Sequence, residues 1–224
     1  CLAHMSEEGY EQKYVKEAFD TNWVVPMGPN VNAFEQNLAD FANANSDGSK
    51  LARKVVCLSA GTAAVHLALI ACGVKAGDEV CVQSFTFCAS SHPIIYLGAK
   101  PVFIDSERET WNMDPELLEK AIIERKTVTG KYPKAIIPVA LYGMPYDCER
   151  IMAIADKYGI SVIEDAAEGM GARFNGQVLG TFGRFGVLSF NGNKMITTSG
   201  GGALICRNEE DANNIMWHAT QARD

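Results

Sequence analysis

The chain alternates short apolar runs with segments of helical spacing, and this alternation constrains its fold more than any other feature. The runs KVVCLSA (54–60) and DEVCVQS (78–84) are each followed by a segment with helical spacing, at 61–74 and 88–99. Strands that are apolar almost throughout must be covered on both faces. The pattern therefore predicts a three-layer α/β/α domain built on a mostly parallel sheet.

The same pattern continues toward the end of the chain. Further strands are predicted at 100–106, 135–141, 160–166, 185–190 and 201–207, and further helices at 114–126, 147–159 and from about 209. Asp114 should cap the helix that Pro115 opens, because Asp favours the N-cap and Pro the first helical position. Outside the alternation, 7–23 has helical spacing and 24–31 is predicted to be an irregular loop.

Composition and charge exclude several classes of protein. Of the 224 residues, 47% are hydrophobic, which is enough for one substantial core. The net charge is -7 and the charges are interspersed, which argues against a nucleic-acid surface. No apolar run reaches the roughly 18 residues that begin to span a membrane, and the first residues lack the pattern of a secretory signal. We therefore expect a cytoplasmic protein without membrane contacts.

The chain has seven cysteines and no CxxC pair. Five of them lie inside apolar segments, namely Cys57, Cys72, Cys81, Cys88 and Cys206. Buried free thiols in a reducing compartment are the expected state. A disulfide framework or a zinc site is a weaker alternative, so no metal site is predicted.

Residues suited to binding and catalysis follow three of the predicted strands. The small residues at 59–62 join a strand to a helix, where backbone N–H groups can bind phosphate. Glu164 and Asp165 end a second strand, and Lys194 follows a third. Taken singly, each has an ordinary explanation as a turn, a helix cap or a surface lysine. Ligands of such sheets bind at the carboxyl ends of the strands, so these residues should meet at one edge.

This set of groups suits pyridoxal 5'-phosphate when Phe85, Phe87 and Ser189 are added to it. A lysine amine forms a Schiff base with the aldehyde of the cofactor. A carboxylate keeps its pyridine nitrogen protonated, which makes the ring an electron sink. An aromatic side chain can stack on the ring, and the helix N-terminus with Ser189 can take the phosphate.

Eight stretches spread over nearly the whole chain resemble the DegT/DnrJ/EryC1/StrS family of pyridoxal-phosphate sugar aminotransferases. They are, in family order, EAFDTNWVVPMGPNVNAFE, LSAGTAAVHLAL, GDEVCVQSFTFCAS, GAKPVFIDSERETWNMDPELLE, LYGMPYD, VIEDAAEGMGA, GTFGRFGVLSFNGNK and TQARD. The resemblance implies the aspartate aminotransferase fold, fold type I. The stretches EDAAE and NGNKMITTSGGG are most similar to C-4 aminotransferases of UDP-linked 4-keto-6-deoxy-N-acetylhexosamines, used in bacterial glycan synthesis.

The resemblance also implies roles for particular residues. Lys194 is implied to be the Schiff-base lysine and to carry protons between cofactor and sugar. Asp165 would pair with the pyridine nitrogen, and Phe87 would stack on the ring. Glu168 stands where the family has Gln, His or Glu near the phenolic oxygen of the cofactor.

The phosphate contacts implied by the resemblance come from two segments. Gly61 and Thr62 would bind the phosphate with Ala60 beside them, and Ser189 would add a hydroxyl. Ala60 departs from the family, since many members have Ser there. Ala140 stands where many have His or Asp, with no derivable consequence. Lys194 itself separates the chain from the dehydratase branch, which has His at that position.

The implied function is transfer of an amino group, with glutamate as the expected donor, to C-4 of a nucleotide-linked keto sugar within a homodimer. Two alternatives stay open: the same cofactor acting on a 3-keto sugar or an amino acid, and an inactive relative that keeps the fold for binding or regulation. Family members are usually much longer. Residues 1–224 are therefore expected to be the N-terminal segment and the large, cofactor-binding domain, without the small C-terminal domain.

Three smaller expectations concern the surroundings of the site. Trp111 either stacks on a sugar or packs its loop against the sheet, and the second is favoured. The glycines at 200–202 are predicted to form a tight turn, because no nucleotide-binding glycine motif accompanies them. Glu164 and Asp165 are adjacent on a strand, so they should face opposite sides of the sheet.

Overall fold

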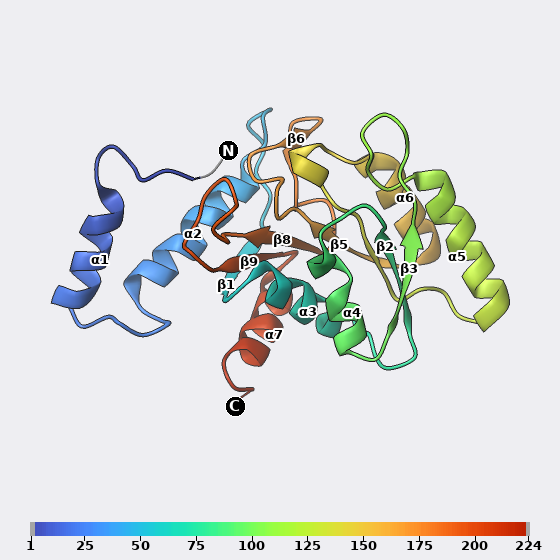
Figure 1. The fold of residues 1–224 in the computed structure, drawn as a ribbon, viewed down its shortest axis with the longest axis horizontal. Coiled ribbons are helices and arrows are strands. Elements are labelled where there is room, and N and C mark those ends of the chain that lie inside the picture. The colour runs from blue at the N-terminus through green and yellow to red at the C-terminus, as the bar shows by residue number, and fades with distance from the viewer. Residues whose placement is uncertain (1–2, 223–224) are drawn as a thin grey trace.

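The computed structural model describes residues 3–222, and its central layer is a seven-stranded sheet (Figure 1). The strands, in the order in which they lie across the sheet, are β1 (Lys54–Leu58), β9 (Gly202–Cys206), β8 (Phe185–Ser189), β5 (Ser161–Asp165), β4 (Ala135–Ile137), β2 (Glu79–Gln83) and β3 (Lys100–Ile104). β9 alone runs in the direction opposite to that of the other six strands. The predicted mostly parallel sheet is confirmed, and the carboxyl ends of the other six strands share one edge.

Helices cover both faces of the sheet. They are α2 (Pro29–Asn43), α3 (Gly61–Ala71), α4 (His92–Tyr96), α5 (Pro115–Thr129), α6 (Cys148–Tyr158) and α7 (Glu209–Ala219), whereas the first helix, α1 (Tyr10–Asp20), is not part of these layers. One buried cluster joins α3, α4 and α7 to the sheet, and the other joins α2, α5 and α6 to it. Side chains alternate between the two: Val80 and Val82 belong to the first cluster and Cys81 to the second. This is why the strands are apolar on both sides.

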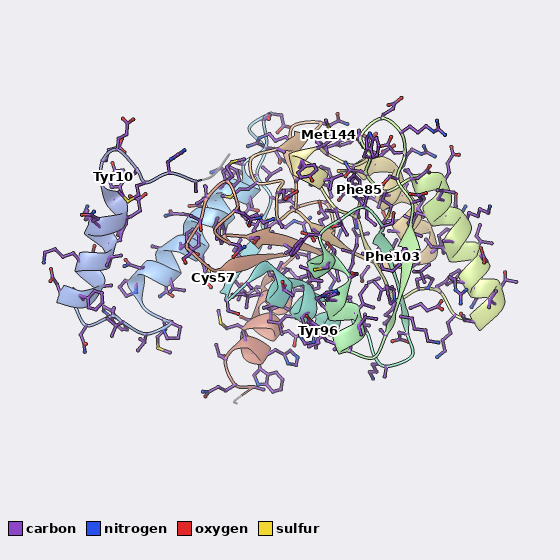
Figure 2. The ribbon with its side chains drawn as sticks, viewed as in Figure 1. Tyr10, Cys57, Phe85, Tyr96, Phe103 and Met144 are labelled. Atoms are coloured by element: carbon purple, nitrogen blue, oxygen red, sulfur yellow. The ribbon has the colours of Figure 1, made fainter. Side chains whose placement is uncertain are left out.

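Helix α1 lies apart from these layers (Figure 1). It confirms the helix expected within 7–23, but none of its residues is buried. Tyr10, labelled in Figure 2, is half exposed, as are Tyr14 and Val15. The sheet and the residues at its edge therefore depend on the segments from α2 onward. No helix within residues 3–222 is both long and apolar enough to cross a membrane.

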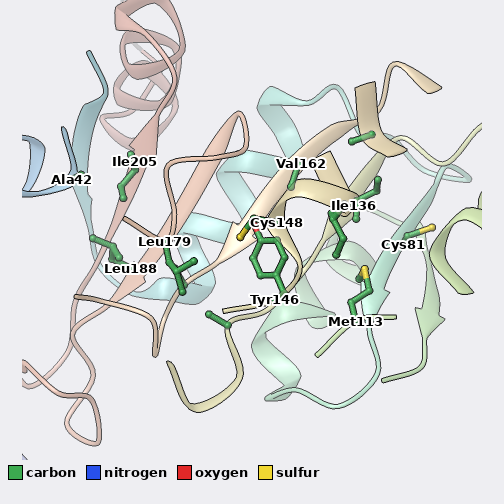
Figure 3. Close-up of a cluster of buried hydrophobic side chains, with 14 of the residues drawn as sticks. Ala42, Cys81, Met113, Ile136, Tyr146, Cys148, Val162, Leu179, Leu188 and Ile205 are labelled. Carbon is green, nitrogen blue, oxygen red and sulfur yellow. The ribbon is translucent and has the colours of Figure 1, made fainter. Parts of the chain in front are cut away.

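The core between the sheet and α2, α5 and α6 contains most of the largest buried side chains (Figure 3). Tyr146 and Met113 are almost completely buried there, and Tyr146 lies beside Cys148. Fully burying one such apolar side chain contributes about 1.5–3 kcal/mol to folding. A core of this kind holds the strand ends in fixed positions.

The cysteines follow the expectation in part. Cys72, Cys81, Cys148 and Cys206 are buried free thiols, and burial raises the pKa of Cys81 to about 12. Cys57 is a half-buried free thiol. Cys88 is exposed, contrary to the prediction, because it begins a short 3-10 turn, η1 (Cys88–Ser90), at the open edge of the sheet. Cys1 lies outside the described residues.

Several predicted boundaries are wrong. The helix expected at 88–99 is divided into η1 and the short helix α4, because Pro93 lacks an N–H and must lie in a first turn. The strand expected at 135–141 ends at Ile137, and a 3-10 turn, η2 (Leu141–Gly143), follows. Helix α2 was not predicted. The hairpin of β6 (Arg173–Phe174) and β7 (Gln177–Val178) was also not predicted.

Candidate active site

A pocket of about 660 Å³ opens at the edge where the parallel strands end. The segments that follow β1, β2, β5 and β8 all contribute to its lining. The residues to which the resemblance assigns a catalytic or cofactor-binding role all line it, namely Ala60, Gly61, Thr62, Phe87, Asp165, Glu168, Ser189 and Lys194. The structure therefore brings these residues together at one edge of the sheet, as expected. The roles assigned to them remain predictions.

The N-terminus of α3 forms one wall of the pocket. Ala60 is the N-cap residue and has an extended backbone. It has no polar side chain that could cap the first turn of the helix. The N–H groups of that turn carry the positive end of the helix dipole, equivalent to roughly half an elementary charge. A Cβ on Gly61 would lie 3.1 Å from the Ser189 Cβ, so glycine lets the helix approach β8 closely. This wall is suited to an anion such as phosphate.

Gly202, in β9, allows the chain to pass directly behind this wall. A Cβ on Gly202 would lie 2.5 Å from the Gly61 nitrogen, closer than real Cβ contacts come. The tight turn predicted for 200–202 is found only in part, since Gly200 lies in a bend, Gly201 has a φ of 150° and Gly202 already begins β9. Glycine is required at 202 by close packing against the start of α3.

We expect Gly202→Ala to lower the free energy of unfolding by about 1–3 kcal/mol, the usual cost of an extra buried methyl group. It should also weaken phosphate binding, because the start of α3 must move. Chemical denaturation and calorimetry with inorganic phosphate measure the two effects. Gly192→Ala is the matched control, since its Cβ would meet nothing nearer than 3.8 Å. Equal stability and phosphate affinity in the two variants would contradict the packing argument.

Asp165 lies at the end of β5 on the side of the sheet that α3 covers, and it is 6% exposed. Its Oδ2 accepts a hydrogen bond from Ser90 Oγ at 2.6 Å, and its Oδ1 accepts one from the Ala167 N–H at 3.2 Å. Burial raises its pKa, whereas these hydrogen bonds and the charge of Lys194 act in the opposite direction. Within residues 3–222 it forms no ion pair. A buried carboxylate of this kind favours a cationic ligand.

Ser90 is a residue of this site that the sequence did not reveal. It is completely buried, and its hydroxyl lies 2.8 Å from Thr86 Oγ1 as well as beside Asp165. The two hydroxyls orient the carboxylate from the loop that follows β2. The pair of serines at 90 and 91 was a visible signal, but only the fold shows which of them faces Asp165.

Lys194 lies in the loop between β8 and β9 with its side chain 13% exposed. Its Nζ is 3.3 Å from Glu168 Oε1, and Glu168 Oε2 accepts the backbone N–H of Tyr142 at 2.9 Å. Tyr142 has a left-handed backbone, with φ 51° and ψ 27°, which is uncommon for a residue with a side chain. Glu168 thus fixes both the amine and the strained turn after β4.

Glu164 faces away from the pocket, as expected for neighbours on a strand. It is 1% exposed, and its carboxylate accepts backbone N–H groups from Gly180 at 2.9 Å and from Phe182 and Gly183 at 2.6 Å. Burial raises its pKa against these bonds. Glu164 therefore stabilises the loop before β8 and takes no part in a two-carboxylate site.

The chain is similar to known aminotransferases in sequence and in structure. Residues 5–223 match the model of the DegT/DnrJ/EryC1/StrS aminotransferase family. Over 221 residues the chain is 51% identical to EpsN of Bacillus subtilis, which is named as a pyridoxal phosphate-dependent aminotransferase. The match covers 99% of this chain and 54% of EpsN. It is 39% identical over 204 residues to the GDP-perosamine synthase of Caulobacter vibrioides, covering 91% of this chain and 51% of that protein.

A third relative is the UDP-2-acetamido-2-deoxy-3-oxo-D-glucuronate aminotransferase of Pseudomonas aeruginosa, 40% identical over 88% of this chain and 51% of that protein. Among solved structures, an aminotransferase from Psychrobacter cryohalolentis has a TM-score of 0.81 at 32% identity, covering 97% of this chain and 51% of that one. NtdA of Bacillus subtilis, solved with bound cofactor PMP, has a TM-score of 0.79 at 29% identity, covering 95% and 45%. The chain spans about half the length of these proteins.

Proposed function

Because the chain belongs to the DegT/DnrJ/EryC1/StrS aminotransferase family, we propose that it is the cofactor-binding part of an aminotransferase that acts on a nucleotide-linked keto sugar. The names of the relatives from Caulobacter vibrioides and Pseudomonas aeruginosa support this class of substrate. The observation that carries the proposal is the buried carboxylate of Asp165, which has no ion pair within residues 3–222 and lines the same pocket as the amine of Lys194.

The residues of the pocket fit pyridoxal phosphate, the cofactor that this family uses. Asp165 offers a buried negative charge to a protonated ring nitrogen. The uncapped N-terminus of α3 and the hydroxyl of Ser189 offer donors to a phosphate. Phe87 is 73% exposed and lines the pocket, so its flat face is free to cover a ring. When bound, the cofactor supplies an electron sink for carbon–hydrogen bond cleavage.

Lys194 is the group that would move the protons. Its Nζ would take a proton from Cα of the amino donor, for which we propose glutamate, and later deliver one to the sugar carbon that receives the nitrogen. Glu168 would hold Nζ at the wall of the pocket through their 3.3 Å contact. Asp165 would keep its charge opposite the ring nitrogen throughout, because Ser90 and the Ala167 N–H stabilise the anion.

We place the new amine at C-4, as the stretch around Asp165 and the stretch around Lys194 favour. Amination at C-3 is the second candidate, and the 3-oxo substrate in the name of the Pseudomonas aeruginosa relative favours it. We also propose that residues 1–224 are the N-terminal segment and cofactor-binding domain of a homodimeric protein. The small C-terminal domain of the family would lie outside this chain, in keeping with the half-length matches. The free buried thiols support a reducing compartment such as the cytoplasm.

The experiment is a titration of the full-length natural protein with pyridoxal phosphate followed by absorbance, then a panel of keto sugars with glutamate. We expect a bound-cofactor band and amination of a 4-keto nucleotide sugar. Amination of 3-keto sugars alone would overturn the C-4 assignment but not the class of reaction. A wild-type protein that binds no cofactor would overturn the proposal and favour a binding or regulatory role.

Ser90→Ala should shift the acidic limb of the activity profile to higher pH. The hydrogen bond from Ser90 lowers the pKa of Asp165, so its loss raises that pKa and leaves fewer ionised carboxylates at a given acidic pH. Loss of one hydrogen bond of about 1 kcal/mol corresponds to roughly a fivefold lower kcat/KM at pH values on the acidic limb. Ser91→Ala is the control, because that hydroxyl donates to the Cys88 carbonyl instead. An unmoved acidic limb would show that Ser90 does not tune Asp165.

A further inference from the structure

A second hollow, of about 590 Å³, lies beside the Lys194 pocket. The residues that line it are Phe85, Asp105, Ser106, Glu107, Arg108 and Trp111. Phe85 lines both spaces, so the two are adjacent at that side chain. Of the groups considered for the cofactor, only Phe85 lies in this hollow. A substrate whose reacting end is at Lys194 can therefore extend its other end into it.

Two exposed aromatic rings form the wall of the hollow. Phe85 is 46% exposed and Trp111 is 59% exposed, and their ring centroids are 5.9 Å apart with planes inclined by 60°. The sequence favoured a Trp111 that packs its loop against the sheet. This prediction is wrong, because the Trp111 side chain is exposed to solvent beside Phe85. Large flat surfaces left open next to an active site are suited to a flat ligand.

The loop that carries Trp111 holds it in an unfavourable conformation. Its φ is 65°, in the left-handed region that bulky residues avoid. The Glu107 carboxylate closes the loop by accepting the Thr110 N–H at 2.8 Å, and the Glu107 N–H donates to the Asn112 carbonyl at 2.9 Å. Strain that is maintained in this way is a feature of ligand-binding sites.

Two buried amides, Gln83 and Asn112, join this loop to the other strand ends. Gln83 Nε2 donates to the Phe85 carbonyl at 2.9 Å, and its Oε1 accepts the Met113 N–H at 2.9 Å. Asn112 Nδ2 donates to the Met144 carbonyl at 3.0 Å. Phe85 and Met144 are both labelled in Figure 2.

Asn112 Oδ1 also accepts the Leu141 N–H at 3.1 Å, at the start of the turn that presents Tyr142. Gln83 and Asn112 are 0% and 1% exposed, so these bonds are shielded from water. The amide pair therefore fixes Phe85 and Trp111 relative to the Lys194 pocket before any ligand binds. Such preorganisation is what a specific binding site requires.

The polar groups of the hollow define its ligand further. The Glu107 carboxylate is engaged by its own loop, whereas Asp105 is exposed and its carboxylate accepts only the neighbouring Ser106 N–H among the described residues. Arg108 is exposed and has no ion pair within residues 3–222. A carboxylate accepts hydrogen bonds from base N–H groups or ribose hydroxyls, and a guanidinium binds phosphate oxygens.

We propose that this hollow binds the nucleoside end of the nucleotide-linked substrate, with the base against Trp111 and Phe85, Asp105 accepting from the base or ribose, and Arg108 near the diphosphate. The inference rests on the proposed function, since it identifies where the nucleotide of that substrate lies. It assigns the discrimination between substrates to residues that take no part in the chemistry at Lys194.

Trp111→Gly is the decisive variant. Glycine accepts the left-handed backbone at 111 without strain, so loss of the ring should not unfold the loop. In the full-length natural protein we expect the KM for the nucleotide sugar to rise about tenfold, within the range of one base–aromatic stack, with kcat and the cofactor absorbance unchanged. Calorimetry with UDP, GDP and dTDP should show the same tenfold weaker binding for the nucleotide that the wild type prefers.

Trp111→Phe should restore most of the affinity, because it keeps an aromatic face. Phe103→Ala is the matched control, as an aromatic residue 57% exposed on the edge strand β3, outside both spaces (Figure 2). An unchanged KM and nucleotide affinity in Trp111→Gly, in a protein that aminates nucleotide sugars, would overturn the inference and leave the proposed function intact. Nucleotide binding weakened by Trp111→Gly, in a protein that aminates no sugar, would support the hollow and overturn the function.

Discussion

Lys194→Met should lower kcat on the order of a thousandfold, within the range that a single proton-transferring side chain contributes. Methionine keeps the length of the side chain but cannot bind or move a proton. The absorbance of bound cofactor should also shift, because the amine that bonds to it is gone. Steady-state kinetics and absorbance of the full-length natural protein measure the two effects together.

The fold should survive this change. The Lys194 side chain makes one ion pair, with Glu168, whose own side chain is 32% exposed and is also held by the Tyr142 N–H. Lys75→Met is the matched control, since Lys75 is exposed and remote from the pocket. A Lys194→Met protein with more than a tenth of the wild-type kcat would rule out Lys194 as the proton-transferring group.

Asp165→Asn should lower kcat about a hundredfold or more, because it removes a preorganised and almost completely buried charge from the wall of the pocket. The amide has nearly the same shape as the carboxylate, and Ser90 can rotate its hydroxyl to suit it. The effect therefore reports the charge itself rather than the packing. Kinetics with saturating cofactor separate it from weaker cofactor binding, and the exposed Asp156→Asn is the control.

The same variant has a stability signature with a defined sign. Burial raises the pKa of Asp165 above its ordinary value of 3.8, so the folded state binds that proton more tightly than the unfolded state. The resulting stability is present below pH 3.8 and is lost as pH rises through the folded pKa. Without cofactor, the wild type should therefore become less stable relative to Asp165→Asn over this interval. If the free energy of unfolding changed with pH equally in the wild type and in Asp165→Asn over this interval, the burial argument would be contradicted.

The predicted layers followed from the strand pattern. Residues 80–82 of the strand predicted at 78–84 are apolar at successive positions, and the structure explains this, since Val80 and Cys81 enter different cores. Turn chemistry was less visible. The strand expected at 135–141 ends at Ile137, before Pro138. The turn beyond it contains Tyr142 in a left-handed backbone that its own sequence does not favour, and Glu168, 26 residues away, holds it there.

Some residues of the candidate site could likewise be predicted from the sequence, and others could not. Lys194 and Asp165 were predicted because each follows a strand, and parallel strands place their carboxyl ends together. Ser90 and Asn112 were not, because their roles depend on partners 75 and 29 residues away. Nothing in a local pattern distinguishes Ser90 from Ser91 before the fold has oriented them.

By itself the sequence determined the α/β layers, the edge of the sheet that carries the site and the residue types gathered there. These depend on periodicity and chain direction, which are local properties. Only the tertiary structure decided how Asp165 is oriented, why Gly202 must lack a side chain, and that Trp111 stands open beside Phe85. Those features depend on distances between segments remote in sequence, which close packing of the two cores fixes to within tenths of an ångström.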